Sequence, residues 1–207
     1  MIIYTFCVHN NHSASALPFL APETSGDLFR PWVRPATSAD IDGIAELVSC
    51  YVAEGLMLPR TSSTIGVHIH NYVVAATPSG IVACAALEEY SPSLGEVSSV
   101  AVARSHQGAG LGTEVVLGVE RLARARSIAQ LFAVSLSRSF FLSLDYRTTN
   151  IANYPEKLAR YDALAAAGTQ IVPKPCFHKS LGTSWQLPRL MKTAPPAANP
   201  SGVARRG

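Results

Sequence analysis

Residues 96–125 read EVSSVAVARSHQGAGLGTEVVLGVERLARA, and this stretch decides the class of fold. It opens on an apolar run that is typical of a strand, passes through Gly108, Gly110 and Gly112, and continues with apolar residues at helical spacing. The first amides of a helix have no intrahelical partners, and the helix dipole adds partial positive charge at that end. The stretch therefore predicts a strand, a glycine-rich turn and a helix whose N-terminus can hold an anion such as a pyrophosphate.

Two familiar nucleotide-binding turns do not fit this pattern. A Rossmann turn has the spacing GxGxxG and an acidic residue about 20 residues further on. Here the spacing is GxGxG, and the next apolar run, at 129–136, ends without Asp or Glu. A P-loop needs a lysine after its last glycine, but Thr113 follows Gly112 directly. A plain glycine turn that binds nothing stays open as an alternative.

The rest of the chain predicts an α/β domain with a mixed, mostly antiparallel central sheet flanked by helices. The expected elements are a short strand near residue 33, a helix opened by Thr37 or Ser38, a hairpin turning at 77–80, the strand and helix of 96–125, a strand at 129–136, helices at 139–146 and 155–168, and a strand or loop at 169–181. The charge pattern of the segment from residue 155 onward favours a surface helix followed by an edge strand.

Composition limits the domain organisation and the partners. A chain of 207 residues that is 48% apolar predicts one globular domain, at 30–190, between an N-terminal extension at 1–29 and a disordered Pro/Ala-rich tail at 191–207. The net charge of +3 is small and owes much to the C-terminal arginines and lysine, so no nucleic-acid partner is expected. The N-terminal apolar runs are too short for a signal peptide or a membrane span, so no membrane partner is expected either.

Cysteines and histidines give no metal-binding pattern. The four cysteines are far apart without a CxxC spacing, which favours free thiols and a cytoplasmic location. His68 and His70 alternate along a β-type run but lack a third ligand at readable spacing. We therefore expect no metal.

The run VAVARSHQGAGLG at 100–112 resembles the acetyl-CoA signature of the GNAT acyltransferases, in which a strand ending V-x-V is followed by a short bridge and Q/R-x-x-G-x-G/A. The resemblance implies a GNAT fold and acetyl-CoA as co-substrate, with the backbone of 107–112 holding the pyrophosphate. It also implies a main-chain N–H near 100–102 that meets the reacting carbonyl oxygen. The cofactor-binding residues are then Val100, Ala101, Val102, Gln107, Gly108, Ala109, Gly110, Leu111, Gly112 and Thr113.

Four flanking stretches resemble, in order, the acetyltransferase domain of bacterial N-acetylglutamate synthases: VRPATSADIDGIAELV, EGLMLPRTS, IVACAALEEYSPSLGEVSSVAV and LFAVSLSRSFF. Without the amino-acid kinase domain of the longer synthases, the chain would be a stand-alone short form. The resemblance implies a cytoplasmic N-acetyltransferase that acts on the α-amino group of an amino acid, L-glutamate, by direct transfer in a ternary complex. It further implies a role in arginine biosynthesis and a homodimer.

Two residues of the central strand are candidate catalytic residues. Transfer to nitrogen needs a neutral amine, so the site must accept a proton from the ammonium. Glu96 matches the glutamate of the G-E-x-x-C motif and is the candidate base, directly or through water; a strand-end surface charge is the alternative. Ser99 stands where the synthases carry cysteine, and its hydroxyl could bond to substrate or to the departing thiolate; a merely small strand residue is the alternative.

The candidates for substrate binding are arginines. A carboxylate-bearing substrate favours a guanidinium, and Arg60 matches the substrate-side arginine of the synthases, with Arg138 as a second candidate. Many GNAT enzymes use a tyrosine as general acid, but its position falls on Phe141, so Ser99 or Tyr154 would serve or the thiolate leaves unassisted. Two other functions stay open: a GNAT acetyltransferase for another small amine, and a coenzyme-A-binding sensor without turnover.

Overall fold

The computed structural model describes residues 30–182, so the predicted extension at 1–29, the tail at 191–207 and the last part of the predicted domain, 183–190, lie outside the described residues. The described residues form a seven-stranded sheet in the order β1-β2-β3-β4-β5-β7-β6. The strands are β1 (Trp32–Pro35), β2 (Tyr72–Thr77), β3 (Gly80–Ser91), β4 (Leu94–Val102), β5 (Gln130–Val134), β6 (Arg147–Thr149) and β7 (Cys176–Ser180). Only β4 and β5 run parallel, so the predicted mixed, mostly antiparallel sheet is confirmed.

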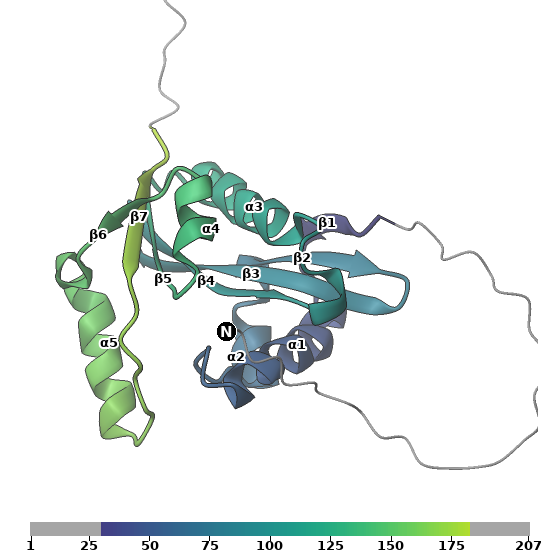
Figure 1. Ribbon diagram of the computed structural model, residues 1–207, viewed down its shortest axis with the longest axis horizontal. Coiled ribbons are helices and arrows are strands. Elements are labelled where there is room, and N and C mark those ends of the chain that lie inside the picture. Colours follow the sequence, from purple (N-terminus) through teal and green to yellow (C-terminus); the bar gives the residue numbers. More distant parts are fainter. Residues whose placement is uncertain (1–29, 183–207) are drawn as a thin grey trace, which may run out of the picture.

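Helices cover both faces of the sheet (Figure 1). They are α1 (Ile41–Ala53), α2 (Ser62–Val67), α3 (Leu111–Ala125), α4 (Arg138–Ser143) and α5 (Pro155–Ala166). Figure 1 shows α3 and α4 on one face, α1 and α2 on the other, and α5 beside β7. Among residues 30–182, no helix combines the length and the apolar character that crossing a bilayer requires.

Several predicted elements are confirmed, one is wrong, and two short ones were not predicted. The hairpin turns at Thr77–Gly80 as predicted. Pro155 opens α5, and the helix ends just before Gly168, whose φ is 85°. The prediction of a late edge strand is wrong, because β7 lies between β5 and β6 and buries Phe177 completely. The short elements α2 and β6 were not predicted, since six and three residues carry too little periodicity to detect.

Two apolar cores lie on opposite faces of the sheet. The spacing of Val115, Val116, Val119 and Ala123 places them on one side of α3, where all four are buried against the sheet. On the other face, α1 packs Ile44, Leu47 and Val48 against alternate residues of β2, β3 and β4. Each strand of the central hairpin therefore contributes to both cores, which explains its nearly continuous apolar sequence.

The central strand β4 is irregular where it leaves its parallel neighbour. It pairs with β5 only over Leu94–Glu96, so the edge of β4 that faces β5 has no strand partner from Val97 onward. Against β3, Ser98 lies opposite Ala86 but Ala101 lies opposite Cys84, so β4 holds one extra residue between them. A β-bulge of this kind bends a strand, and here it moves the second half of β4 away from β5.

We predict that Gly118→Val destabilises the fold, because a Cβ at this position of α3 would lie 2.6 Å from Cγ1 of Val73 on β2. Overpacking of a filled core costs about 2 kcal/mol. Urea unfolding should therefore show a lower midpoint than for Ala125→Val, which adds the same β-branched side chain at an exposed position of the same helix. Equal midpoints for the two variants would contradict this account of the close approach of α3 to the sheet.

Candidate active site

A cleft of about 200 Å³ opens where β4 and β5 separate. Its floor is β4, one wall is the segment between α1 and α2, and the opposite walls are α5 and the segment that leads from β5 into α4. The lining includes Tyr51, Met57, Leu58, Arg60, Glu96, Ser98, Ser99, Val100, Ser135, Ser137, Phe141, Lys157, Tyr161 and Lys174. The cleft thus brings together the predicted residues Glu96 and Ser99 of β4 and Arg60, which is far from them in the sequence.

Ser99 is the extra residue of the β-bulge. Its φ of 51° lies in the left-handed region, which costs a non-glycine residue roughly 1–3 kcal/mol and is held here by the pairing on both sides of it. Cys84 donates a thiol hydrogen bond to the Ser99 carbonyl oxygen at 3.4 Å. The bulge turns the 98–100 segment toward the cleft. The sequence does not predict this bulge, because a serine within a strand is compatible with regular pairing.

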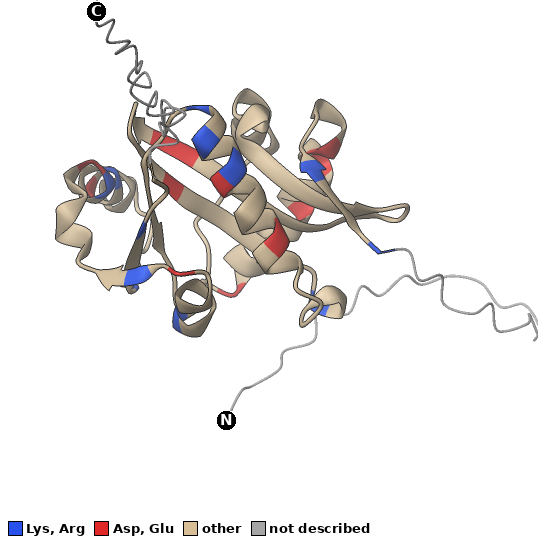
Figure 2. Ribbon diagram, turned by 90° about the horizontal axis from the view of Figure 1, so that it is seen from above, with Lys and Arg blue, Asp and Glu red and all other residues tan. Residues whose placement is uncertain are grey.

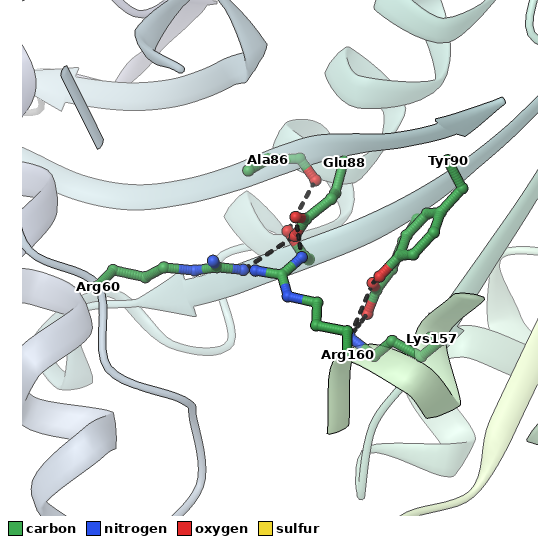
Figure 3. Close-up of polar contacts among 8 residues, drawn as sticks. Arg60, Ala86, Glu88, Tyr90, Lys157 and Arg160 are labelled. Atoms are coloured by element: carbon green, nitrogen blue, oxygen red, sulfur yellow. Dashed lines mark hydrogen bonds and ion pairs between the residues drawn. The ribbon is translucent and has the colours of Figure 1, made fainter. Parts of the chain in front are cut away.

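Glu96 is a buried ion-pair partner rather than a surface charge. Its side chain is about 4% exposed, and Nζ of Lys157 lies 2.8 Å from both of its carboxylate oxygens. The hydroxyl of Tyr90 donates to Oε2 at 2.9 Å (Figure 3). Burial and the nearby carboxylate raise the pKa of the Tyr90 hydroxyl, so Tyr90 remains a donor to Glu96. The alternative of a strand-end surface charge is therefore wrong.

The helix α5 is part of the site, although its sequence favoured a surface helix. Lys157 is 4% exposed, and its ammonium lies 4.7 Å from the centre of the Tyr161 ring. Burial and the Glu96 charge raise the pKa of Tyr161 to about 12. Lys157, Arg160 and Tyr161 are three and four residues apart and so share one face of the helix. The spacing of these residues in the sequence indicates a shared helix face. Only the structure shows that this face is turned toward the cleft rather than toward solvent.

A second carboxylate lies beside Glu96. Glu88 on β3 is directly opposite Glu96 on β4, so both side chains project from the face of the sheet that carries α1. Nη2 of Arg60 donates to Oε2 of Glu88 at 3.0 Å, and Arg160 donates to Oε1 (Figure 3). Burial, and the neighbouring Arg60, lower the pKa of Arg160. Sequence reasoning identified only Arg60 of this group.

Arg138, the second predicted substrate arginine, occupies a different position. It is the first residue of α4 and is exposed, and it is not among the residues that line the cleft. Arg160 is the guanidinium that accompanies Arg60.

The glycine-rich turn leads from the end of β4 into α3. Gly108 and Gly110 have φ values of 82° and 81°, and a Cβ on either would meet no atom within 4 Å. Within residues 30–182, the backbone amides from 108 to 113 have no hydrogen-bond partner, and the first helical bond is made by the amide of Glu114. The side chain of Gln107 donates to Tyr51 at 2.9 Å and so ties the turn to α1. The turn thus presents a row of free amides at a helix N-terminus, which fits a pyrophosphate.

The aromatic residues considered as general acids lie in apolar surroundings. Phe141 lines the cleft with only 2% exposure and packs on Tyr146 and Phe177, and it has no proton to donate. Tyr154 stacks on Phe132 at 4.0 Å between ring centres and is not among the cleft residues. The described cleft instead offers the hydroxyls of Ser99, Tyr51 and Tyr161, of which Tyr51 donates to the Val102 carbonyl.

Figure 2 shows acidic and basic segments interspersed over the described part of the chain. Among residues 30–182, no three His, Cys, Asp or Glu side chains lie close enough together to hold a metal ion.

We predict that Lys157→Met lowers the free energy of unfolding by about 3 kcal/mol, because it leaves the Glu96 carboxylate buried without its partner. Glu96→Gln in the same chain should recover a large part of that loss, since the buried charge is then gone. Denaturant unfolding of the two single variants and the double variant gives the coupling. Strictly additive losses would contradict the buried ion pair.

Comparisons with known proteins agree with this geometry. A model of the acetyltransferase (GNAT) family matches residues 43–141. The uncharacterized N-acetyltransferase CT2212 of Chlorobaculum tepidum is 29% identical over 128 residues, which are 62% of this chain and 83% of that protein. The amino-acid acetyltransferase of Ralstonia nicotianae is 31% identical over 127 residues, which are 60% of this chain but 28% of that protein. The chain thus spans under a third of that relative.

Solved structures share the fold. Rv2747 of Mycobacterium tuberculosis, in complex with CoA and NLQ, has a TM-score of 0.63 at 23% identity and covers 72% of this chain and 99% of its own. N-acetylglutamate synthase of Neisseria gonorrhoeae, with coenzyme A and N-acetyl-glutamate, has a TM-score of 0.63 at 24% identity and covers 73% of this chain and 35% of its own. The residues that match the family model include β4 and β5, where these strands separate, and the turn whose free amides precede α3. The chain belongs to the GNAT family of N-acetyltransferases.

Proposed function

We propose that the protein transfers the acetyl group of acetyl-CoA to the α-amino group of a dicarboxylic amino acid, L-glutamate, directly in a ternary complex. The observation that carries the proposal is the cleft itself, which brings Arg60 together with Glu96 of the bulged strand β4, whose free edge leads to the amides of 108–113. A role in arginine biosynthesis and a homodimer follow from the resemblance, and a cytoplasmic location follows from the resemblance and the cysteine pattern; all three stay predictions.

The residues of β4 and the turn suit coenzyme A. The amides of Gly108, Ala109, Gly110, Leu111, Gly112 and Thr113 are free to bind the pyrophosphate, while the side chain of Gln107 holds the turn in place. The peptide groups of Val100, Ala101 and Val102 that point away from β3 belong to the part of β4 that β5 no longer pairs, so they can bond to an extended pantetheine arm. The Val102 carbonyl already accepts from Tyr51. Bound acetyl-CoA supplies the acetyl thioester.

The chain's own residues then manage the proton and the developing charge. Glu96, directly or through a water, takes the proton that the acceptor's ammonium must lose before nitrogen attacks the carbonyl carbon. A main-chain N–H between Val100 and Val102 donates to the carbonyl oxygen as the N–C bond forms and the C–S bond breaks. The acylated nitrogen then loses its second proton, which goes to the departing thiolate or to solvent. The Ser99 hydroxyl, which lines the cleft, is the predicted donor to the departing thiolate. A thiol pKa near 8.5 also allows the thiolate to leave unassisted.

Charge around the cleft supports a dicarboxylic acceptor. Arg60, Glu96, Lys157 and Lys174 line the cleft, and Glu88 and Arg160 adjoin it through the ion pairs of Glu88 with both arginines. Four cations thus accompany two carboxylates. Lys174 donates to the Leu56 carbonyl oxygen at 2.6 Å, and burial together with Lys157 lowers its pKa. The site therefore has an excess of positive charge, which matches the two carboxylates of glutamate once its amine is neutral. Arg138 stays a predicted second contact on α4.

A coenzyme-A-binding sensor without turnover is the second candidate, because the resemblance puts Phe141 at the position of the general acid, and Phe141 lines the cleft with an apolar ring. Thiol release from acetyl-CoA with a panel of amino acids and polyamines separates the candidates. A sensor binds acetyl-CoA but releases no thiol with any acceptor, whereas a transferase for another amine releases thiol with polyamines and not with glutamate.

Arg60→Ala should raise the KM for glutamate by roughly tenfold to a hundredfold, because a charged hydrogen bond to a carboxylate contributes about 1.5–3 kcal/mol. The KM for acetyl-CoA should stay nearly the same. Arg121→Ala, at an exposed position of α3, is the matched control and should behave as the wild type. An unchanged KM for glutamate in Arg60→Ala would rule out this acceptor pocket.

Gly110→Ala should weaken acetyl-CoA binding about tenfold or more, because its Cβ enters the open space in front of the free amides where the pyrophosphate is expected. Gly168→Ala is the control: its φ of 85° imposes the same backbone strain, and its Cβ also meets no atom, but it lies after α5. Isothermal titration with coenzyme A measures both. Equal affinities would place the pyrophosphate elsewhere.

A further inference from the structure

Glu88 holds together two walls of the cleft. Arg60 comes from the segment between α1 and α2, Arg160 comes from α5, and each binds a different oxygen of the Glu88 carboxylate. Figure 3 shows the two guanidiniums meeting at Glu88 from different elements. A single carboxylate on the sheet therefore sets the position of both arginines.

The Arg60–Glu88 pair also stands between two cavities. Arg60 and Ser98 line the cleft described above, and they also line an adjoining chamber of about 190 Å³. The chamber is further lined by His68, Tyr72 and Glu88. An acceptor whose amine lies near Ser99 can therefore extend its side chain past Arg60 toward this chamber, whose lining includes Arg60 and Glu88, and Arg160 contacts Glu88 there from α5.

Glu88 and Glu96 are neutralised to different extents although they are neighbours in the sheet. Glu96 has one cation, Lys157, and both partners are at most 5% exposed. Glu88 has two cations and remains 28% exposed, as Arg160 remains 30% exposed. One carboxylate cannot balance two guanidiniums, and each guanidinium has five donors of which only one contacts Glu88. The group thus keeps one positive charge and free donors for a second carboxylate.

We propose that Glu88 is a specificity-determining residue: an internal carboxylate that shares Arg60 and Arg160 with the side-chain carboxylate of the acceptor. Its charge sets how strongly the site prefers a dicarboxylic amino acid over the corresponding neutral amide. Arg160 supplies the charge that Glu88 balances, so the two residues act in opposite directions. This inference rests on the proposed function and adds residues that resemblance did not identify.

The test compares glutamate with glutamine, which have nearly the same shape and differ by one charge. Glu88→Gln frees both guanidiniums and should raise the ratio of kcat/KM for glutamate to that for glutamine about tenfold, mainly through KM. In Arg160→Gln, Glu88 neutralises the one remaining arginine, Arg60, so the ratio of kcat/KM for glutamate to that for glutamine should fall about tenfold. The double variant restores the net charge and should return the ratio to within about threefold of the wild type.

Two controls separate charge from folding. Glu46→Gln and Arg121→Gln make the same charge changes at exposed positions of α1 and α3 and should leave the ratio unchanged. Thermal unfolding and coenzyme A affinity, measured for every variant, identify any that are damaged as a whole. If Glu88 only supports the structure, both single variants lose activity with both acceptors in proportion, the double variant is worse than either, and the inference is overturned.

The outcome for the wild type distinguishes this inference from the proposed function. Thiol release with glutamate in the wild type, with an unchanged ratio in Glu88→Gln, overturns only the role of Glu88. No binding of glutamate or glutamine to the coenzyme A complex of the wild type, measured by isothermal titration, overturns both. Opposite shifts in the two single variants with recovery in the double variant support both.

Discussion

The separation of β4 from β5 after Glu96 is the constraint on which the rest of the site depends. Parallel pairing with β5 would use the peptide groups on the edge of β4 that faces away from β3, but only Leu94–Glu96 are paired in this way. The bulge at Ser99 turns the remainder of the strand, and the unpaired edge then borders the cleft. Only the short 3-10 helix Arg104–His106 separates this edge, which ends at Val102, from the turn at 107–112, so an extended ligand can reach both backbone features.

The cleft walls are held by charge, whereas the sheet and α3 are held by apolar packing. The core residues of α3 are at most 2% exposed and pack against the sheet. By contrast, α5 reaches the sheet through two ion pairs, Lys157 with Glu96 and Arg160 with Glu88. The glutamates are opposite one another on β3 and β4, and their cations are one helical turn apart on α5, so the spacing of a sheet matches the spacing of a helix. Ionic contacts of this kind place fixed charges in the cleft that an apolar contact would not supply.

Sequence reasoning was accurate for features that depend on neighbouring residues. The strand, turn and helix of 96–125, the hairpin and the bounds of α5 all follow from periodicity, glycine and proline. Glu96, Ser99 and Arg60 were identified by resemblance, and the structure brings them into one cleft. Lys157 and Arg160 were missed because their partners are 61 and 72 residues away, and a lysine paired with a distant buried carboxylate looks like any surface lysine in the sequence.

The sequence by itself determined the local chemistry: a strand that runs into free amides, a glutamate at the start of that strand, and an arginine in a separate motif. Only the tertiary structure decided what these groups contact. Pairing Glu88 with Glu96 across two strands, and placing α5 over both, requires the register of β3 and β4 and the insertion of β7 between β5 and β6. Register and strand order are set by the fit of two apolar cores on opposite faces of one sheet, and that fit is a property of the whole domain.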